Sequence, residues 1–315
     1  MKEVGRYILT SSVRALFTLV AVSAIVFSLA RLSGSPLDVL ADPNLSAEGR
    51  AAVMEFWGLD RPLPEQYLTF ISNAVRGDLG QSFKFPGESV TEVIIRRLPP
   101  TLLLGTVGLM MTVLIGVPIG VISAVRRGSL IDKSAKGLAL IGQSVPEFWL
   151  GIVLIWVFAV QLGWVPTGGQ QGWTSVIMPA FVTAMFGIAA LLRLLRSSML
   201  DTLGSEYVKL AHLKGVRRSV VVWKHAFKAA SIAPLTFFGR IVVHLATGAT
   251  VVEVVFSWPG LGLLAYEAAN ARDYSVVQAL ALITCAAFVF VNLAVDFLYA
   301  YVDPRVRLGG RAAAT

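Results

Sequence analysis

The sequence is poor in charged side chains and in cysteine. Only 15% of its 315 residues are charged and 56% are apolar, whereas about a quarter of a soluble domain is charged. This composition excludes a disordered chain and disfavours an ordinary soluble enzyme. The single cysteine, Cys285, excludes an internal disulfide framework and any metal site built from several cysteines.

Motifs for catalysis, metal binding or nucleotide binding are also lacking. The three histidines, His212, His225 and His244, do not have the spacing of metal ligands. The segment Gly128–Ser134 resembles a phosphate loop, but it lacks the glycine directly before the lysine and is interpreted as a charged turn. The sequence therefore predicts no catalytic residue, no metal and no cofactor in this chain. Any driven work must use energy from a partner or an ion gradient.

Long apolar runs are what the sequence has in abundance. Six stretches reach the length of about 20 residues that one helical membrane crossing needs. We therefore expect an all-α membrane protein with six transmembrane helices. The stretches are Tyr7–Leu32, Thr101–Val125, Gly137–Leu162, Val176–Met199, Ser231–Phe256 and Ser275–Tyr301.

The positive charges predict the orientation of these spans. Of the 27 Lys and Arg residues, 18 lie in four segments, 2–14, 126–136, 193–228 and 305–311, which share one side if six spans alternate. Lys and Arg concentrate in cytoplasmic loops, so both termini are expected in the cytoplasm. The net charge of +8 is explained in this way, and no nucleic-acid partner is expected.

The charge pattern also predicts the domain organisation. The segment Ser33–Pro99 carries six Lys or Arg and nine Asp or Glu residues together with turn signals, which indicates a small folded extracytoplasmic subdomain. Residues 1–99 would then form the first transmembrane helix and this subdomain. Residues 100–308 would form a five-helix core with a cytoplasmic loop at 197–230, and residues 309–315 a tail.

The cytoplasmic loop 197–230 contains a short amphipathic pattern. Glu206 suits the positive N-terminus of a helix, and Gly215 suits a left-handed cap at its end. The pattern leaves two interpretations open, a surface helix that lies on anionic lipid and a docking helix for a cytoplasmic protein. The residues on one face are Tyr207, Leu210, Ala211 and Lys214.

An ordered set of motifs resembles the permeases of ABC importers, and most closely the dipeptide/oligopeptide/nickel family. The segment Glu206–Gly215, followed by His225-Ala226 and Pro234, is similar to the coupling loop of that family. The other matching segments are Gly58–Tyr67, Gly77–Ser82, Arg97–Thr101, Ser144–Gly151, Glu253–Gly262, Arg272–Tyr274, Asn292–Tyr299 and Asp303–Arg305.

The resemblance implies a multi-pass transport subunit of the bacterial inner membrane that is not itself an enzyme. It would form half of the pathway for small peptides or a related solute, paired with a second, often non-identical permease. An external solute-binding protein would deliver the solute, and two cytoplasmic ATPase subunits would bind ATP and Mg. The residues implied to contact the ATPase are Glu206, Tyr207, Leu210, Ala211, Lys214 and Gly215. A gradient-driven transporter or channel is the alternative function.

Three ionisable residues within the spans are candidates for the solute pathway. Arg240 and His244 lie one turn apart in the fifth span, and Glu147 lies at a similar depth in the third. Intramembrane charges either pair or line water, so Arg240 either pairs with Glu147 or faces the solute with His244. In the second span, Gly116 and Gly120 predict close helix packing, and in the third Pro146 predicts a kink.

Overall fold

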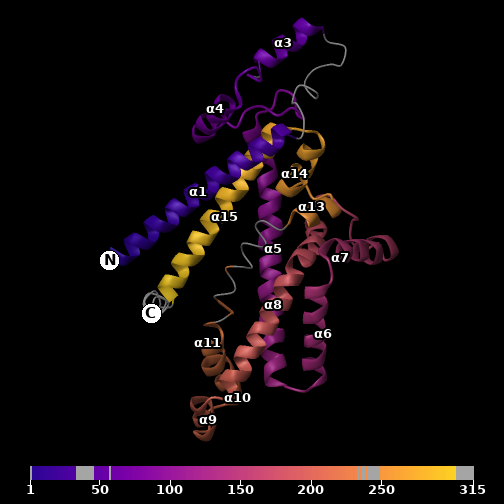
Figure 1. Ribbon diagram of the computed structural model, residues 1–315. Helices are drawn as coiled ribbons and strands as arrows, with labels where there is room; N and C mark the ends of the chain where they lie inside the picture. The colour runs from indigo at the N-terminus through magenta and orange to yellow at the C-terminus, as the bar shows by residue number, and fades with distance from the viewer. Residues whose placement is uncertain are drawn as a thin grey trace. The chain divides into compact units, whose positions relative to one another are not determined.

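The computed structural model describes residues 2–32, 46–56, 58–232, 234–235, 239 and 249–302 (Figure 1). Throughout these residues the structure is helical, with an isolated bridge between Gln81 and Ser89 in place of any strand. The chain forms two compact units. Unit 1 comprises Met1–Pro100 and Pro259–Leu293, and unit 2 comprises Thr101–Trp258 and Ala294–Thr315. The candidate pathway residues Arg240 and His244, residues 33–45 of the expected subdomain and the tail 309–315 lie outside the described residues.

Unit 1 packs around the N-terminal end of helix α5. Val90, Val93 and Ile94 of α5 are buried against Leu264 of α14 and Val276 of α15. The helices that contribute to unit 1 are α1 (Lys2–Leu32), α3 (Ala47–Phe56), α4 (Leu63–Val75), the start of α5 (Val90–Val125), α14 (Leu261–Asn270) and most of α15 (Tyr274–Val302).

Unit 2 contains the remainder of α5 and a series of shorter helices around α8. The remaining elements are α6 (Leu130–Ser144), α7 (Glu147–Leu154), the π-helix η1 (Ile155–Gln161), the 3-10 helix η2 (Trp173–Val176), α8 (Ile177–Leu203), α9 (Glu206–Leu213), α10 (Arg218–Val220), the π-helix η3 (Val221–Ala226), α11 (Phe227–Ala230) and α13 (Thr250–Val255).

Helix α8 is the centre of unit 2, and α5 and α6 lie along it (Figure 1). Two glycines of α5 allow the close approach that the sequence predicts. A Cβ atom on Gly120 would lie 3.1 Å from the carbonyl oxygen of Leu192, and one on Gly116 would lie 3.3 Å from Leu191 Cδ2. Small residues also form the contact between α6 and α8, where Ala135 and Ala139 are buried against Ala189.

The described helices confirm an apolar, all-helical chain but not the count of six spans. Three are long and apolar enough to cross a membrane, Val90–Val125, Trp173–Leu203 and Tyr274–Ala294. A fourth is obtained if the bent pair of α6 with α7 and η1 counts as one span. Helix α5 also begins eleven residues before the expected Thr101 and continues through Pro99 and Pro100.

The expected third span, Gly137–Leu162, is wrong as a continuous helix. The chain bends by 111° between α6 and α7. Val145 (ψ 125°) and Pro146 (ψ 137°) both leave the helical conformation at the break. A proline disfavours helical geometry in the residue before it and cannot donate a backbone hydrogen bond, so the kink expected at Pro146 is a full break.

Candidate functional site

Helix α9 stands where the sequence predicts a short amphipathic helix. Ser205 is extended (ψ 152°), and its hydroxyl donates to the carbonyl of Thr202 at 2.5 Å. Glu206 occupies the first turn, where a carboxylate suits the positive end of the helix. Lys209 Nζ lies 2.7 Å from Glu206 Oε1 in an exposed ion pair. The start of α9 is thus separated from the end of α8 by a sharp, hydrogen-bonded turn.

The end of α9 is a Schellman motif centred on Gly215. The amide of Gly215 donates to the carbonyl of His212 at 3.0 Å, and the amide of Val216 donates to the carbonyl of Ala211 at 3.3 Å. Gly215 has a φ of +75°, a left-handed conformation that glycine adopts without steric cost. The position of Gly215 after the amphipathic pattern predicts this conformation.

One face of α9 is fixed to the core of unit 2. Val208 is fully buried, in a cluster with Val121 of α5, Met199 of α8 and Val221 of η3. Ala211 is half-buried and packs against the same cluster. Ala211, which the sequence pattern groups with Leu210, therefore also contacts the chain's own core. A larger residue at Ala211 would disturb the seat of α9, by which we mean the buried cluster of Val121, Met199 and Val221 that holds Val208.

The opposite face of α9 presents apolar side chains to solvent. Tyr207 is 48% exposed, Leu210 is 52% exposed and Leu213 is 84% exposed. Lys214 is also exposed, at the C-cap position. Burial of exposed leucines on a short, rigid helix is a common source of binding energy in helix-in-groove recognition. The geometry therefore gives α9 an anchored face and a free apolar face.

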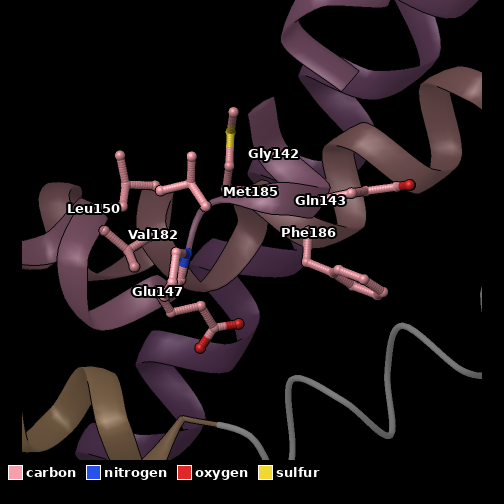
Figure 2. Close-up of a pocket in the computed structure, with 9 residues that line it drawn as sticks. Gly142, Gln143, Glu147, Leu150, Val182, Met185 and Phe186 are labelled. Atoms are coloured by element: carbon pink, nitrogen blue, oxygen red, sulfur yellow. The ribbon is translucent and has the colours of Figure 1, made fainter. Parts of the chain in front are cut away.

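The remaining candidate, Glu147, is the first residue of α7 and lies at the break between α6 and α7. It lines a cavity of about 190 Å³ together with Gln143, Leu150, Met185 and Phe186. Figure 2 shows the carboxylate of Glu147 extending away from Leu150 and Met185. The break interrupts the regular helix at this point and leaves the Glu147 side chain beside a cavity whose lining is both polar and apolar.

The comparison with protein families decides what kind of molecule this is. Residues 116–308, more than half of the chain, match the family of binding-protein-dependent transport system inner membrane components. The chain belongs to this family. It is therefore a permease of an ABC importer. Permeases of this family work with an ATPase and a binding protein. Of the two functions that the sequence leaves open, ATP-driven import is the one this family performs.

Curated relatives match the permease over almost its whole length. The oligopeptide transport system permease protein AppB of Bacillus subtilis (strain 168) is 38% identical over 311 residues, 95% of this chain and 98% of AppB. The glutathione transport system permease protein GsiC of Escherichia coli (strain K12) is 39% identical over 291 residues, 92% of this chain and 95% of GsiC. A putative peptide permease of Brucella suis biovar 1 is 39% identical over 317 residues, 96% of this chain and 99% of that protein.

A solved structure has the same fold. A chain of the inward-facing MetNI methionine ABC transporter aligns with a TM-score of 0.52 at 18% identity, covering 67% of this permease and 96% of that chain. At this identity the likeness concerns the fold alone.

The sequence did not reveal a buried ionic cluster at the end of α5, the start of α6 and the C-terminal part of α8. Asp132 is fully buried, and its two oxygens accept from Arg196 Nε at 2.6 Å and Nη2 at 3.0 Å. Ser123 Oγ donates to the same carboxylate at 2.6 Å, the Gly128 amide donates at 3.0 Å, and Lys136 Nζ lies 3.2 Å away. Gly128–Ser134 is therefore a turn only at its start, because α6 begins at Leu130. The signal in the sequence was Asp132 itself, which is the single acidic residue in the basic segment 126–136.

Proposed function

We propose that this permease imports small peptides or a related solute as one half of a translocation pathway. The names of AppB and GsiC, and the length over which they match, support a peptide-class solute. A second homologous permease would complete the pathway, and an external binding protein would deliver the solute. Two cytoplasmic ATPase subunits would bind ATP and Mg.

The proposed topology has six spans with both termini in the cytoplasm. It is supported by the 18 of 27 Lys and Arg residues that fall on one side of such an arrangement. In this topology α9 lies in the cytoplasm and Ser33–Pro99 lies outside. The bent pair of α6 and α7 with η1 would serve as one span, with its break at Pro146.

The observation that carries the proposal is the two-faced geometry of α9. A helix that transmits force needs one face fixed to the membrane domain and another that binds the moving partner. Val208 supplies the first contact, because it is buried in the core of unit 2. Leu210 and Leu213 supply the second. We infer that Glu206, Tyr207, Lys214 and Gly215 complete this coupling site, with Ala211 as part of its seat.

The first prediction concerns the exposed face of α9. Changing both Leu210 and Leu213 to aspartate should release the ATPase from the purified transporter while the permease still inserts. Full burial of one leucine contributes about 1.5–3 kcal/mol, so loss of two should weaken binding by well over tenfold. The measurement is the amount of ATPase that copurifies with tagged permease, followed by its affinity for the permease in nanodiscs.

A matched control makes the same chemical change on another exposed helix. Leu63 and Leu68 of α4 are 55% and 64% exposed, and changing both to aspartate should leave ATPase binding unchanged. If the α9 variant retains the ATPase as well as the α4 variant does, α9 is not the docking element.

The second prediction concerns the cap of α9. Gly215→Val should lower the solute transported per ATP hydrolysed in proteoliposomes, because a β-branched residue resists the φ of +75°. Asparagine tolerates this conformation, so Gly215→Asn should retain most of the coupling. Equal loss in both variants would show that the left-handed conformation is not what coupling requires.

Glu147 is proposed to line the solute pathway at the break between α6 and α7. Its position beside the cavity at Gln143 and Phe186 supports this role. Arg240 and His244 are proposed to act with it. Both the pairing of Arg240 with Glu147 and a direct contact of Arg240 with the solute stay open.

A further inference from the structure

A second surface of unit 2 has a different character from α9. A groove of about 450 Å³ lies where the last turn of α5 meets the first turn of α6 and the segment of α10 and η3. No residue of α9 lines it. Val222 forms part of its wall and also belongs to the buried cluster that holds Val208, so the groove shares a wall with the seat of α9.

The polar side of the groove is positively charged. Arg126 follows α5 directly and Arg218 begins α10, and both side chains line the groove with Ser219. Both arginines are exposed, and neither forms an ion pair with any carboxylate in the part of the chain that the structure describes. No Asp or Glu lines the groove. The neighbouring Asp132 is buried and bound to Arg196, so it does not offset this charge.

The other side of the groove is apolar and open. Ile122 and Ile131 are 40% and 41% exposed, and the indole of Trp223 is half exposed. Ile122 belongs to the last turn of α5, a helix that is apolar enough to cross a membrane, and Ile131 of α6 and Trp223 of η3 line the same groove. Tryptophan is enriched at this level, where the hydrocarbon gives way to the headgroups.

We propose that this groove binds one anionic phospholipid. Arg126, Arg218 and the Ser219 hydroxyl would hold the headgroup phosphate, and Ile122, Ile131 and Trp223 would contact the first part of an acyl chain. Unpaired cations above an apolar wall at the end of a membrane-spanning helix match this ligand, because basic pockets between such helices recognise anionic headgroups. The proposed orientation would place this groove in the cytoplasmic leaflet of the membrane. The binding of the lipid does not depend on that orientation.

The test titrates the detergent-purified transporter with phosphatidylglycerol and counts bound lipids by native mass spectrometry. We expect one tightly bound phosphatidylglycerol per permease, with phosphatidylcholine bound much more weakly. Changing both Arg126 and Arg218 to alanine should weaken this one site about thirtyfold, the effect expected for two basic contacts to an anionic lipid. Ser219→Trp, which fills the groove without a change of charge, should also remove it.

The matched control removes the same charge from neighbouring positions. Arg127 and Arg217 are exposed and do not line the groove, so changing both to alanine should leave the site intact. If both double variants lost the same amount of phosphatidylglycerol binding, the effect would be a general attraction between positive charge and anionic lipid. That result would overturn the proposal. Loss of the ATPase from the Arg126 and Arg218 variant, with lipid binding unchanged, would assign the groove to the ATPase interface instead. Neither result depends on the outcome for Leu210 and Leu213.

Discussion

Replacing Arg196 with methionine should destabilise the permease by about 2–4 kcal/mol, among the largest effects of any single substitution in unit 2. Removing one partner of a buried ion pair costs about 3–5 kcal/mol, because the other charge is left uncompensated. Asp132 is fully buried and would retain Ser123, the Gly128 amide and the largely exposed Lys136. Those remaining contacts reduce the expected loss from this range to about 2–4 kcal/mol.

The measurement is the free energy of unfolding in mixed micelles, combined in a double-mutant cycle. Asp132→Asn added to Arg196→Met should recover part of the loss, because no buried charge remains. Arg193→Met is the control, since Arg193 lies one turn earlier on α8 and is exposed. If Arg196→Met is no more harmful than Arg193→Met, the cluster contributes nothing to stability.

The cluster also explains how α9 is placed. Asp132 joins the start of α6 to Arg196 on α8 and to Ser123 on α5, so it holds these three helices together. Helix α9 follows α8 after a short turn at Ser205 and packs on the same two helices, α5 and α8, through Val208. The apolar seat of α9 therefore lies on helices whose ends are tied by ionic contacts.

Local features of the sequence were enough to predict α9. Its face pattern repeats within eight residues, and Gly215 marks its end without reference to the rest of the chain. The partners of its buried face could not be predicted, because they depend on how α5, α8 and η3 meet. The contact of Ala211 with this cluster could not be predicted for the same reason.

Contacts between residues that are far apart in the chain could not be predicted from the sequence. Asp132 and Arg196 are 64 positions apart, and no periodicity joins them. Pro146 predicts a kink, but neither the bend of 111° nor the packing of Gly151 of α7 against Phe256 is visible in the sequence. A Cβ atom on Gly151 would lie 3.1 Å from the ring of Phe256, so a larger residue would require this ring to shift by a few tenths of an ångström.

Two motifs that resemble the family meet in unit 1. Ser82 closes the segment Gly77–Ser82, and Asp273 lies within Arg272–Tyr274, 191 positions away. Asp273 is fully buried. Its Oδ2 accepts from Ser82 Oγ at 2.5 Å and from the amides of Phe83 and Lys84 at 2.9 and 3.0 Å. The two motifs are separate in the sequence. The fold brings them together, because the carboxylate of Asp273 accepts hydrogen bonds from the loop that begins at Ser82.

Replacing Asp273 with alanine should therefore release the loop around Ser82 and destabilise unit 1 by about 2–4 kcal/mol. Three donors on that loop would lose their acceptor, and an unsatisfied buried donor costs about 1–3 kcal/mol. The amide of Val276, which donates to Asp273 Oδ1 at 3.3 Å, would also lose its partner at the start of α15. We expect the amides of Phe83 and Lys84 to exchange with deuterium much faster, as measured by mass spectrometry of the reconstituted permease.

The control removes an exposed carboxylate close to the same loop. Glu88 forms an exposed ion pair with Arg96 at 2.7 Å, and pairs of this kind contribute at most about 1 kcal/mol. Glu88→Ala should leave exchange at Phe83 and Lys84 unchanged. Asp273→Asn should fall between the two, because its single carbonyl oxygen replaces only one of the two carboxylate oxygens. Slow exchange in Asp273→Ala would mean that the loop is held by its apolar contacts, chiefly Phe85 against the cluster around Val90, and not by the carboxylate.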